Sequence, residues 1–355
     1  MSAAPVLIMA GGTGGHIFPG IAVAKELMAR AVPVLWLGSE GGLETRLVPQ
    51  AGIELKTIAI SGVRGKGVAS LLAAPLKICR AVIAAWKLIG AARPRSVLSM
   101  GGYVAGPGGI AAWLRGVPLV VHEQNSIAGT TNRILAKFAK RRLCGFEGAL
   151  PRSEWIGNPV RAEIAALAPP AERFAARASS ANLLVLGGSQ GARALNRVLP
   201  AALAAMPESA RPMVRHQCGA KFADEARAAY AQAGVEVSIE PFIDDMAAAY
   251  AWADFVVCRA GALTIAELCA AGVGSLLVPF PFAVDDHQTR NAMWMVEHDA
   301  AELVQEGKLD AAFLGKLLRI RESRVLLLKA AEAARALAKP RATANIADIC
   351  LGVAA

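Results

Sequence analysis

One pattern occurs twice in the chain and constrains its fold more than any other feature: a short apolar run, a cluster of small residues, and then a helical pattern. Val6–Ala10 precedes GGTGGH at 11–16, and Leu183–Leu186 precedes GGSQGAR at 187–193. The helical patterns that follow are Ile17–Arg30 and Ala192–Met206. Because the glycine clusters lie 176 residues apart, about half the chain, we expect each half to begin as strand, tight turn and helix.

More apolar runs of strand length alternate with helical stretches in both halves. They are Val34–Leu37, Ser96–Met100, Pro118–Val121, Val235–Ile239, Phe255–Cys258 and Ser275–Val278. Repeated alternation of this kind is typical of parallel sheets covered by helices on both faces. With 355 residues and 55% apolar content, the chain is long enough for two such domains and too apolar for disorder.

The fold class predicted from these patterns is α/β, with two Rossmann-like, doubly wound domains. We place the first at residues 1–160 and the second at 161–340, because the Asn-Pro pair in Gly157–Val160 disfavours helix. Pro340 should break the helical tail that begins at Ser323, and residues 341–355 are expected to form a helix that returns to the first domain. Ligands of such sheets bind beyond the carboxyl ends of the strands, so an interdomain cleft lined by the glycine clusters is expected.

Positive charge is concentrated in the first half. Residues 1–160 carry 18 Lys and Arg against 7 Asp and Glu, whereas residues 161–355 carry 20 and 21. Between Leu55 and His122 there are nine basic residues and no acidic one. This imbalance favours a surface that faces phosphates, nucleic acid or an anionic membrane. Nucleic acid is not expected as a partner, because aromatic side chains are scarce and no recognised binding motif occurs.

The amino-terminal segment and the cysteines favour a cytoplasmic protein. Val6–Ala10 is too short for the core of a signal peptide and follows no basic residue. The longer uncharged windows Ser96–Leu114 and Leu268–Val284 are interrupted by Gly or Pro, so neither predicts a spanning helix. The six cysteines lie at least eleven positions apart, which excludes zinc spacings and redox pairs. We expect no metal and no cofactor.

The glycine clusters favour phosphate binding. Glycines after a strand let backbone N–H groups approach an anion, and the next helix adds partial positive charge. Neither cluster fits G-x-G-x-x-G, and no P-loop motif occurs, which weakens the dinucleotide oxidoreductase and ATPase interpretations. Asp-x-Asp is also missing, so a leaving diphosphate would depend on backbone dipoles and cations such as Arg161 or Arg193. The competing interpretation is a tight turn that only connects a strand to a helix.

Polar residues at expected strand ends are candidate functional groups. His16 closes the first glycine cluster and could act as a general base or bind an anion, although it could equally hold the turn. The string HEQN at 122–125 follows an apolar run and should emerge at the same edge of the sheet. Thr264 and Glu267 have capping-box spacing. Alternatively, that helix start binds phosphate while Glu267 accepts hydrogen bonds from two ribose hydroxyls.

The acid-free stretch contains an amphipathic helical pattern at Leu71–Ile89. Lys77, Arg80 and Lys87 fall within about 80° of one another at about 100° per residue, and apolar residues spread over the rest. A basic edge beside a broad apolar face, next to Arg64 and Lys66, favours a helix that lies in an anionic membrane interface. The competing interpretation is a core helix with solvated cations. The expected membrane contacts are Leu72, Leu76, Lys77, Arg80, Trp86 and Lys87.

Several long strings together resemble one known family. They are GGTGGH at 11–16, SGVRGKG at 61–67, MGGYVAGPGG at 100–109, HEQNSIAG at 122–129, GNPVR at 157–161, GGSQGAR at 187–193, FIDDMAAAYAWAD at 242–254 and CRAGALTIAE at 258–267. These strings resemble the bacterial N-acetylglucosaminyltransferases that act on UDP-N-acetylglucosamine and undecaprenyl-pyrophosphoryl-muramoylpentapeptide in peptidoglycan synthesis. The resemblance covers the chain from Val6 to about Ala292.

The resemblance implies a GT-B fold and an enzyme that converts lipid I to lipid II as a peripheral protein on the cytoplasmic membrane face. UDP-GlcNAc would bind mainly the second domain, with Ser189 near the diphosphate, Ile243 presenting its backbone to uracil and Glu267 on the ribose. Asn125 and Gln288 would face the sugar. The full set of donor contacts implied by the family is Thr13, Gly14, Gly15, Asn125, Arg161, Ser189, Ile243, Ala262, Leu263, Thr264, Ile265, Glu267 and Gln288.

The reaction implied by the resemblance is a single inverting displacement. An α-linked donor gives a β-1,4 product when the acceptor 4-hydroxyl attacks opposite UDP, so one base on the acceptor side suffices. His16 is the candidate base, and Glu123 is a possible substitute or orienting partner. Two alternatives remain open: a UDP-GlcNAc epimerase with a similar twin-domain form, which needs no lipid acceptor, and a sensor that binds the UDP-sugar without turnover.

Overall fold

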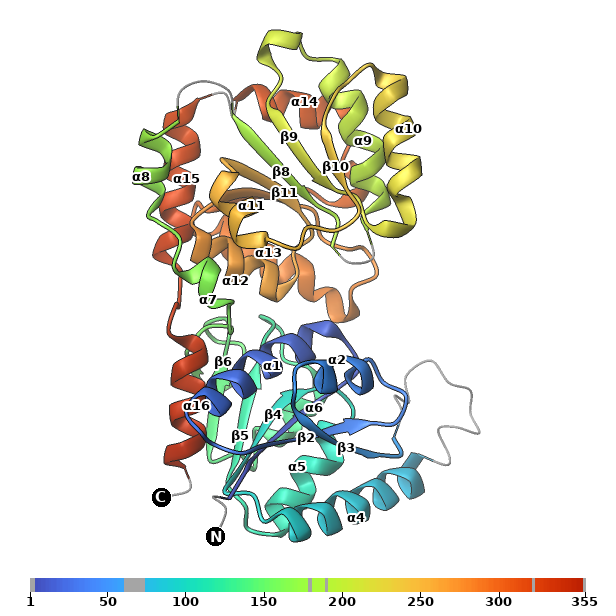
Figure 1. The fold of residues 1–355 in the computed structure, drawn as a ribbon, viewed down its shortest axis with the longest axis vertical. Coiled ribbons are helices and arrows are strands. Elements are labelled where there is room, and N and C mark those ends of the chain that lie inside the picture. The colour runs from blue at the N-terminus through green and yellow to red at the C-terminus, as the bar shows by residue number, and fades with distance from the viewer. Residues whose placement is uncertain (1–3, 61–73, 178–180, 189–190, 321–322, 354–355) are drawn as a thin grey trace. The chain divides into compact units, whose positions relative to one another are not determined.

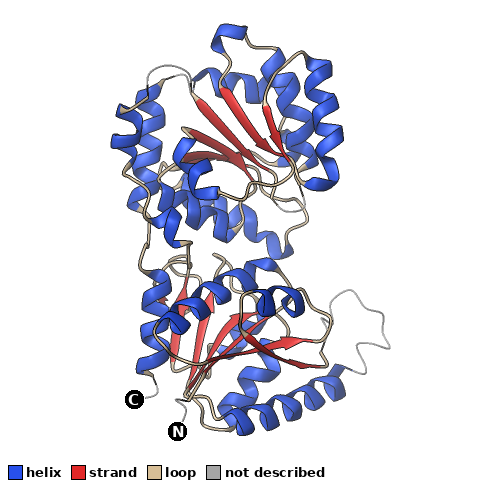
Figure 2. Ribbon diagram, viewed as in Figure 1, coloured by secondary structure: helices blue, strands red, loops and turns tan. Residues whose placement is uncertain are grey.

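The computed structural model describes residues 4–60, 74–177, 181–188, 191–320 and 323–353 (Figure 1). The chain divides into two compact units. Unit 1 comprises Met1–Val160 and Lys339–Ala355, and unit 2 comprises Arg161–Ala338. In each unit the strands form a sheet between layers of helices, as Figure 2 shows by colour.

The sheet of unit 1 has the strand order β3-β2-β1-β4-β5-β6-β7, and every neighbouring pair is parallel. Its strands are β1 (Val6–Ala10), β2 (Val34–Ser39), β3 (Glu54–Ile58), β4 (Ser96–Gly101), β5 (Leu119–Glu123), β6 (Arg141–Cys144) and β7 (Glu154–Trp155). Its helices are α1 (Gly14–Ala29), α2 (Glu44–Gln50), α4 (Ala74–Ala92), α5 (Ala105–Leu114), α6 (Thr130–Leu135) and α16 (Ala342–Gly352).

Strand β1 lies at the centre of two cores. Successive side chains of a strand point to opposite faces. Val6 and Ile8 accordingly pack with residues of α1 and α16, whereas Leu7 and Met9 pack with residues of α4 and α5. This burial on both faces explains why the strand reads as a continuous apolar run rather than an alternating one.

The sheet of unit 2 repeats this design with the order β10-β9-β8-β11-β12-β13, again parallel throughout. Its strands are β8 (Asn182–Leu186), β9 (Met213–Gln217), β10 (Ser238–Glu240), β11 (Phe255–Cys258), β12 (Gly274–Leu277) and β13 (Ala301–Leu303). Its α-helices are α7 (Ala162–Ala165), α8 (Pro170–Ala175), α9 (Arg193–Ala204), α10 (Ala223–Ala233), α11 (Met246–Trp252), α12 (Ala262–Ala271), α13 (His287–Val296), α14 (Ala311–Ile320) and α15 (Arg324–Ala336). Short 3₁₀ turns are η1 (Glu208–Ala210), η2 (Ala220–Phe222), η3 (Val284–Asp286) and η4 (Glu306–Lys308).

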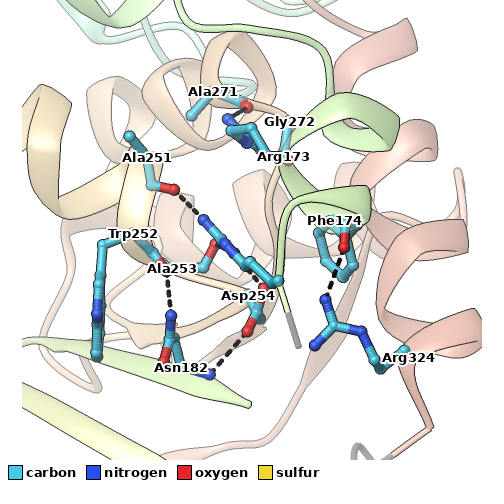
Figure 3. Close-up of polar contacts among 11 residues, drawn as sticks. Arg173, Phe174, Asn182, Ala251, Trp252, Ala253, Asp254, Ala271, Gly272 and Arg324 are labelled. Carbon is cyan, nitrogen blue, oxygen red and sulfur yellow. Dashed lines mark hydrogen bonds and ion pairs between the residues drawn. The ribbon is translucent and has the colours of Figure 1, made fainter. Parts of the chain in front are cut away.

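A buried arginine on α8 anchors the carboxyl end of α12. Arg173 donates hydrogen bonds to the carbonyl oxygens of Ala271 (2.6 Å) and Gly272 (2.7 Å), as Figure 3 shows. Its positive charge lies where the helix dipole is negative, and burial lowers the pKa of its guanidinium to about 10. Asp254, just before β11, accepts a hydrogen bond from the backbone N–H of Asn182 in β8 (2.8 Å; Figure 3). The first contact joins α8 to the end of α12, and the second joins the start of β11 to β8.

The expected doubly wound α/β class is confirmed in both units, with local differences. The strand expected at Val235–Ile239 begins only at Ser238. The reason is the end of α10, where Gly234 adopts a left-handed conformation and Val235 N–H bonds to the carbonyl of Tyr230 (3.1 Å). Helix α1 begins at Gly14, so two of the glycines belong to its first turn. Within the described ranges, none of the helices combines the length and apolar character needed to cross a bilayer.

Candidate active site

The two glycine clusters lie at equivalent points of the two sheets. Strand β1 lies between β2 and β4, and β8 lies between β9 and β11, so the strand order reverses at β1 and at β8. Ligands of open parallel sheets bind beyond the carboxyl ends of the strands at such reversal points. GGTGGH follows β1 and GGSQGAR follows β8. Each unit therefore has its candidate site where its own topology favours one.

The turn after β1 exposes helix N-terminal amides above a buried carboxylate. Thr13 is the extended N-cap of α1, and Gly14 and Gly15 form its first turn, whose N–H groups have no carbonyl of a preceding turn to bind. Glu44 is fully buried below the turn and accepts hydrogen bonds from Gly12 N–H (3.3 Å) and Ser39 Oγ (2.6 Å). Sequence reasoning missed Glu44, which holds the turn from below.

His16 occupies the edge that the sequence predicted, and its hydrogen-bond partner comes from the HEQN string that was expected at the same edge. Its Nδ1 lies 2.8 Å from Oε1 of Gln124, which follows the carboxyl end of β5. The ring also packs beside Gly101 at the end of β4, where an added Cβ would lie 3.1 Å from it. Three strand ends therefore meet at this imidazole, which is only partly buried.

Glu123, the other candidate catalytic residue, points into its own loop. Its carboxylate accepts hydrogen bonds from the backbone N–H groups of Asn125 (3.0 Å) and Gly129 (3.1 Å) and from Nδ2 of Asn132 (3.0 Å), and the side chain is buried. The side chain that binds Nδ1 of His16 is Gln124. Gln124 therefore lies beside His16, in the orienting position for which Glu123 was a candidate. Glu123 instead shapes the loop that carries Asn125.

In unit 2, α12 follows β11, and its start does not have the geometry of a capping box. The N-cap of α12 is Gly261, which has no side chain, and Thr264 lies inside the first turn. The interpretation of Thr264 and Glu267 as a capping box is therefore wrong, because that motif requires Thr264 itself at the N-cap. The backbone of Ala262–Ile265 is left as an open helix N-terminus, with Ile265 N–H bonded back to Gly261 (2.9 Å).

The Glu267 carboxylate projects from the second turn of α12 and has two side-chain partners. Arg161 donates from Nε (3.0 Å) and Nη2 (2.8 Å) to Oε1, and the buried Tyr250 hydroxyl lies 3.3 Å from Oε2. Burial raises the pKa of Glu267 against the opposing effect of Arg161. The side chain keeps 18% of its surface exposed, so this partly desolvated carboxylate can still accept hydrogen bonds from a ligand. Sequence reasoning missed Tyr250.

Two further donor candidates are described in unit 2: Ile243 precedes α11, and Gln288 lies in the first turn of α13. Ile243 is buried just before α11. Oε1 of Gln288 accepts a hydrogen bond from Phe280 N–H (2.9 Å), which leaves the amide NH₂ as a donor group. Ser189 lies outside the described residues, as do Leu72, Arg64 and Lys66.

Helix α4 exposes most of its large apolar side chains. Ala81, Ala85 and Ile89 face the core, whereas Leu76 is 65% and Trp86 43% exposed. Ile78 and Ile83 are exposed as well, and so are the three cations Lys77, Arg80 and Lys87. The interpretation of this apolar face as mostly domain core is therefore wrong within unit 1, since only Ala81, Ala85 and Ile89 are buried and Val82 and Leu88 are half-buried.

The residues that the structure describes contain no group of three or more His, Cys, Asp or Glu that could hold a metal ion. Asp285 and Asp286 both adopt positive φ angles, in the turn that leads into α13. The amides of the helix starts are groups of the kind that can bind an anion.

Comparison with protein families gives two matches that follow the division of the chain. The glycosyltransferase family 28 N-terminal domain matches residues 6–144, and the glycosyltransferase family 28 C-terminal domain matches residues 182–346. Together they cover most of the chain, including the two glycine clusters.

Individual relatives are similar over nearly the whole length. The chain is 60% identical to the "UDP-N-acetylglucosamine--N-acetylmuramyl-(pentapeptide) pyrophosphoryl-undecaprenol N-acetylglucosamine transferase" of Xanthomonas campestris pv. campestris strain B100, over 99% of this chain and 82% of that protein. It is 56% identical to the transferase of the same name from Xylella fastidiosa strain M12, over 98% of this chain and 95% of that protein.

Solved structures agree with this similarity. The crystal structure of MurG from Acinetobacter baumannii is 40% identical, covers 99% of this chain and 100% of that one, and superposes with a TM-score of 0.89. The calicheamicin glycosyltransferase CalG4 is 16% identical over 98% of both chains with a TM-score of 0.66, which supports the fold alone. The expected GT-B class of two Rossmann-like domains is confirmed by these neighbours.

Proposed function

The chain belongs to glycosyltransferase family 28, and from this membership we propose that it transfers GlcNAc from UDP-GlcNAc to the 4-hydroxyl of the muramoyl unit of lipid I, giving lipid II. The observation that carries the proposal is the identity of 60% over 99% of the chain with a transferase of that name. The site geometry supports it, because each unit presents at its sheet reversal point the groups that one half of this reaction needs.

We assign the donor mainly to unit 2. The open N-terminus of α12 at Ala262–Ile265 offers backbone N–H groups to the diphosphate. Glu267 accepts hydrogen bonds from the ribose hydroxyls, with Arg161 and Tyr250 holding its carboxylate. Further donor contacts in this assignment are Ser189 near the diphosphate, the backbone of Ile243 at uracil, Gln288 and Asn125 at the sugar, and Thr13, Gly14 and Gly15.

The chemical step in this proposal is one displacement at the anomeric carbon. The acceptor 4-hydroxyl oxygen forms the new bond while the bond to UDP breaks, and the hydroxyl proton passes to His16. The electron pair of the broken bond leaves with UDP, whose negative charge the helix N-terminus stabilises. Arg161 and Arg193 are the cations we place near this charge. Glu123 acts only through the loop that it shapes.

The lipid acceptor requires contact with a membrane surface, which we assign to α4 of unit 1. Leu76 and Trp86 supply apolar side chains for insertion, and Lys77, Arg80 and Lys87 supply cations for an anionic bilayer. Exposure of such large apolar side chains beside three cations supports an interfacial helix on the cytoplasmic face.

Incubation with UDP-GlcNAc, with and without a lipid I analogue, tests the proposal. A transferase releases UDP and forms a disaccharide lipid only when the acceptor is present. Epimerisation of the donor without acceptor would favour the epimerase, and donor binding without any turnover would favour the sensor. The measurement is mass analysis of the lipid together with free UDP.

A further inference from the structure

A chain of polar groups runs inward from His16 through unit 1. His16 Nδ1 contacts Oε1 of Gln124 at 2.8 Å. The other end of that amide, Nε2, lies 3.0 Å from Nδ1 of His122, and Nε2 of His122 lies 2.9 Å from the carbonyl oxygen of Gly157. His122 and Gln124 are buried at 0% and 1% exposure, so these contacts are shielded from water.

The inner end of this chain fixes its direction. A carbonyl oxygen only accepts hydrogen bonds, so the Gly157 carbonyl requires a proton on Nε2 of His122. Burial lowers the pKa of His122 to about 4, which keeps the ring neutral with a single N–H. Its Nδ1 is therefore an acceptor, and the atom of Gln124 that faces it must be the NH₂ group.

A second contact fixes the same orientation independently. Nε2 of Gln124 also lies 3.0 Å from the backbone carbonyl oxygen of His122, which again can only accept. The amide cannot be reversed without placing two oxygens against each other. Asn158 Nδ2 further holds the loop by donating a hydrogen bond to the backbone carbonyl oxygen of Gln124 (2.9 Å).

The outer end of the chain follows from the inner end. With its NH₂ group directed inward, Gln124 presents its carbonyl oxygen to His16, so Nδ1 of His16 must carry the proton. A neutral imidazole then has its lone pair on Nε2. That is the atom left to take a proton from a substrate hydroxyl.

We infer that Gln124 is a positioning residue that, backed by His122 and the Gly157 carbonyl, holds His16 in the Nδ1–H tautomer and so keeps Nε2 free as the proton acceptor. The inference rests on the proposed function only in assigning His16 the role of base. The tautomer itself is a property of the protein without substrate. Gln124 takes the place that a carboxylate occupies beside histidine in other base dyads, without adding a charge.

Nitrogen-15 NMR of the full chain tests the tautomer directly. The chain has five histidines, and the His16 ring is identified as the signal lost in His16→Asn. The neutral ring is expected to show a protonated Nδ1 and an unprotonated Nε2. A wild-type His16 that is protonated on Nε2, or that mixes both forms equally, would overturn the inference without reference to any variant or to activity.

Two substitutions at Gln124 test the consequence for turnover. Gln124→Leu removes the acceptor, so His16 is expected to shift toward Nε2–H and kcat to fall roughly 10- to 100-fold, the scale seen when the partner of a functional histidine is lost. The KM for UDP-GlcNAc is expected to stay within about twofold. Gln124→Glu keeps an oxygen toward His16 and, when its inner oxygen carries a proton that binds Nδ1 of His122, should retain the Nδ1–H form and recover part of kcat.

The matched control is Gln217→Leu, the same change at a buried glutamine at the carboxyl end of β9 in unit 2. It should leave the His16 nitrogen shifts as they are. An unchanged tautomer and unchanged kcat in folded Gln124→Leu would overturn the inference. If the wild-type protein shows the predicted tautomer but no transfer to a lipid I analogue, the proposed function fails while the assignment of the tautomer stands.

Discussion

The two units have the same sheet design but present opposite kinds of polar group at its reversal point. Unit 1 presents an imidazole whose inner nitrogen is bound to a neutral amide, which suits it to exchange a proton. Unit 2 presents a carboxylate bound to an arginine and a tyrosine, which suits it to accept hydrogen bonds without changing its charge. The shared scaffold therefore sets where a ligand binds, and the residues behind each reversal point set what the site can do.

The supports beneath the two sites differ in the same way. Under the first turn lies Glu44, a carboxylate fully buried among backbone N–H groups and a serine hydroxyl. Under the second turn, the glycine cluster that follows β8, backbone packs against backbone. Gly191 lies so close to Cys218 that an added Cβ would be 2.6 Å from the Cys218 carbonyl oxygen. Close backbone contact occurs at both turns, since a Cβ added to Gly102 would lie 2.2 Å from the carbonyl oxygen of Gly11, and the buried Glu44 side chain is an additional support of the first turn.

The largest effect is expected at the imidazole of unit 1. His16→Ala should lower turnover by roughly two to four orders of magnitude, the usual range for loss of a general base, because no other group takes the acceptor proton. Affinity for UDP-GlcNAc, measured by calorimetry, should stay nearly unchanged. Equal turnover rates in the wild-type and His16→Ala proteins across the pH range would show that His16 takes no part in the reaction. The contrast drawn between the two units would then be wrong.

The carboxylate of unit 2 should show the reverse pattern. Glu267→Gln replaces one of the two acceptor oxygens with a donor NH₂ group and removes the charge, so it should weaken UDP-GlcNAc binding by about 2 to 4 kcal/mol. The matched control is Glu240→Gln, which alters another arginine-bound carboxylate of the same unit, that of the Arg215 pair, and should leave donor affinity unchanged. Donor affinity that stays at the wild-type value in Glu267→Gln would show that Glu267 only supports the helix.

The surface charge of unit 1 gives the next prediction. Replacing Lys77, Arg80 and Lys87 by Gln should weaken binding to anionic vesicles by about 3 kcal/mol at most, and more at low salt than at high salt. Vesicle sedimentation at two salt concentrations measures this loss, and a donor titration should show no change.

The control for this variant is a triple substitution in unit 2, Lys308, Lys316 and Arg319 to Gln, which removes three exposed cations that do not belong to α4. It should sediment with vesicles as the wild-type protein does. If the α4 variant also sediments like the wild type at both salts, membrane contact must be sought elsewhere, first around Arg64, Lys66 and Trp113.

The smallest effect concerns the pH dependence of donor binding. Because burial raises the pKa of Glu267, its carboxylate takes up a proton at a higher pH than an ordinary glutamate. Protonation removes acceptor capacity from the Glu267 side chain. Donor affinity should therefore have its full value above this raised pKa and should fall as the pH falls through it. Donor titrations from neutral to acidic pH measure the loss. Glu267→Gln should lack this pH dependence, and an identical profile in both proteins would assign it to another group.

Sequence patterns predicted most of the central strands of each unit, but they missed β9 beside β8 and the edge strand β3. β1 and β11 have the predicted limits, because strands buried on both faces read as continuous apolar runs. β3 was missed because it is an edge strand in which Glu54 and Lys56 alternate with less polar residues. The helix pattern at 71–89 was found, but its spacing could not tell which apolar side chains face the core.

The site divides in the same way. His16 and Glu267 were identified because each follows a recognisable strand, turn and helix, and this order is local in the sequence. Gln124 and Tyr250 were missed as partners because they approach those residues from 108 and 17 positions away along the chain, through contacts that no local pattern records. The capping box, one of two open interpretations of Thr264 and Glu267, is wrong because their spacing occurs inside the first turns of the helix.

The sequence by itself determined the repeated α/β design, the positions of the two glycine clusters and the basic surface of the first half, since apolar runs, glycines and charges act through nearest neighbours and simple periodicity. Only the tertiary structure decided which groups orient the functional side chains. Parallel strands bring His16 to the same edge as His122 and Gln124, and the direction of their hydrogen bonds depends on two backbone carbonyls, those of Gly157 and His122. Hydrogen bonds are directional and short, so their partners are fixed only when the folded chain has placed them.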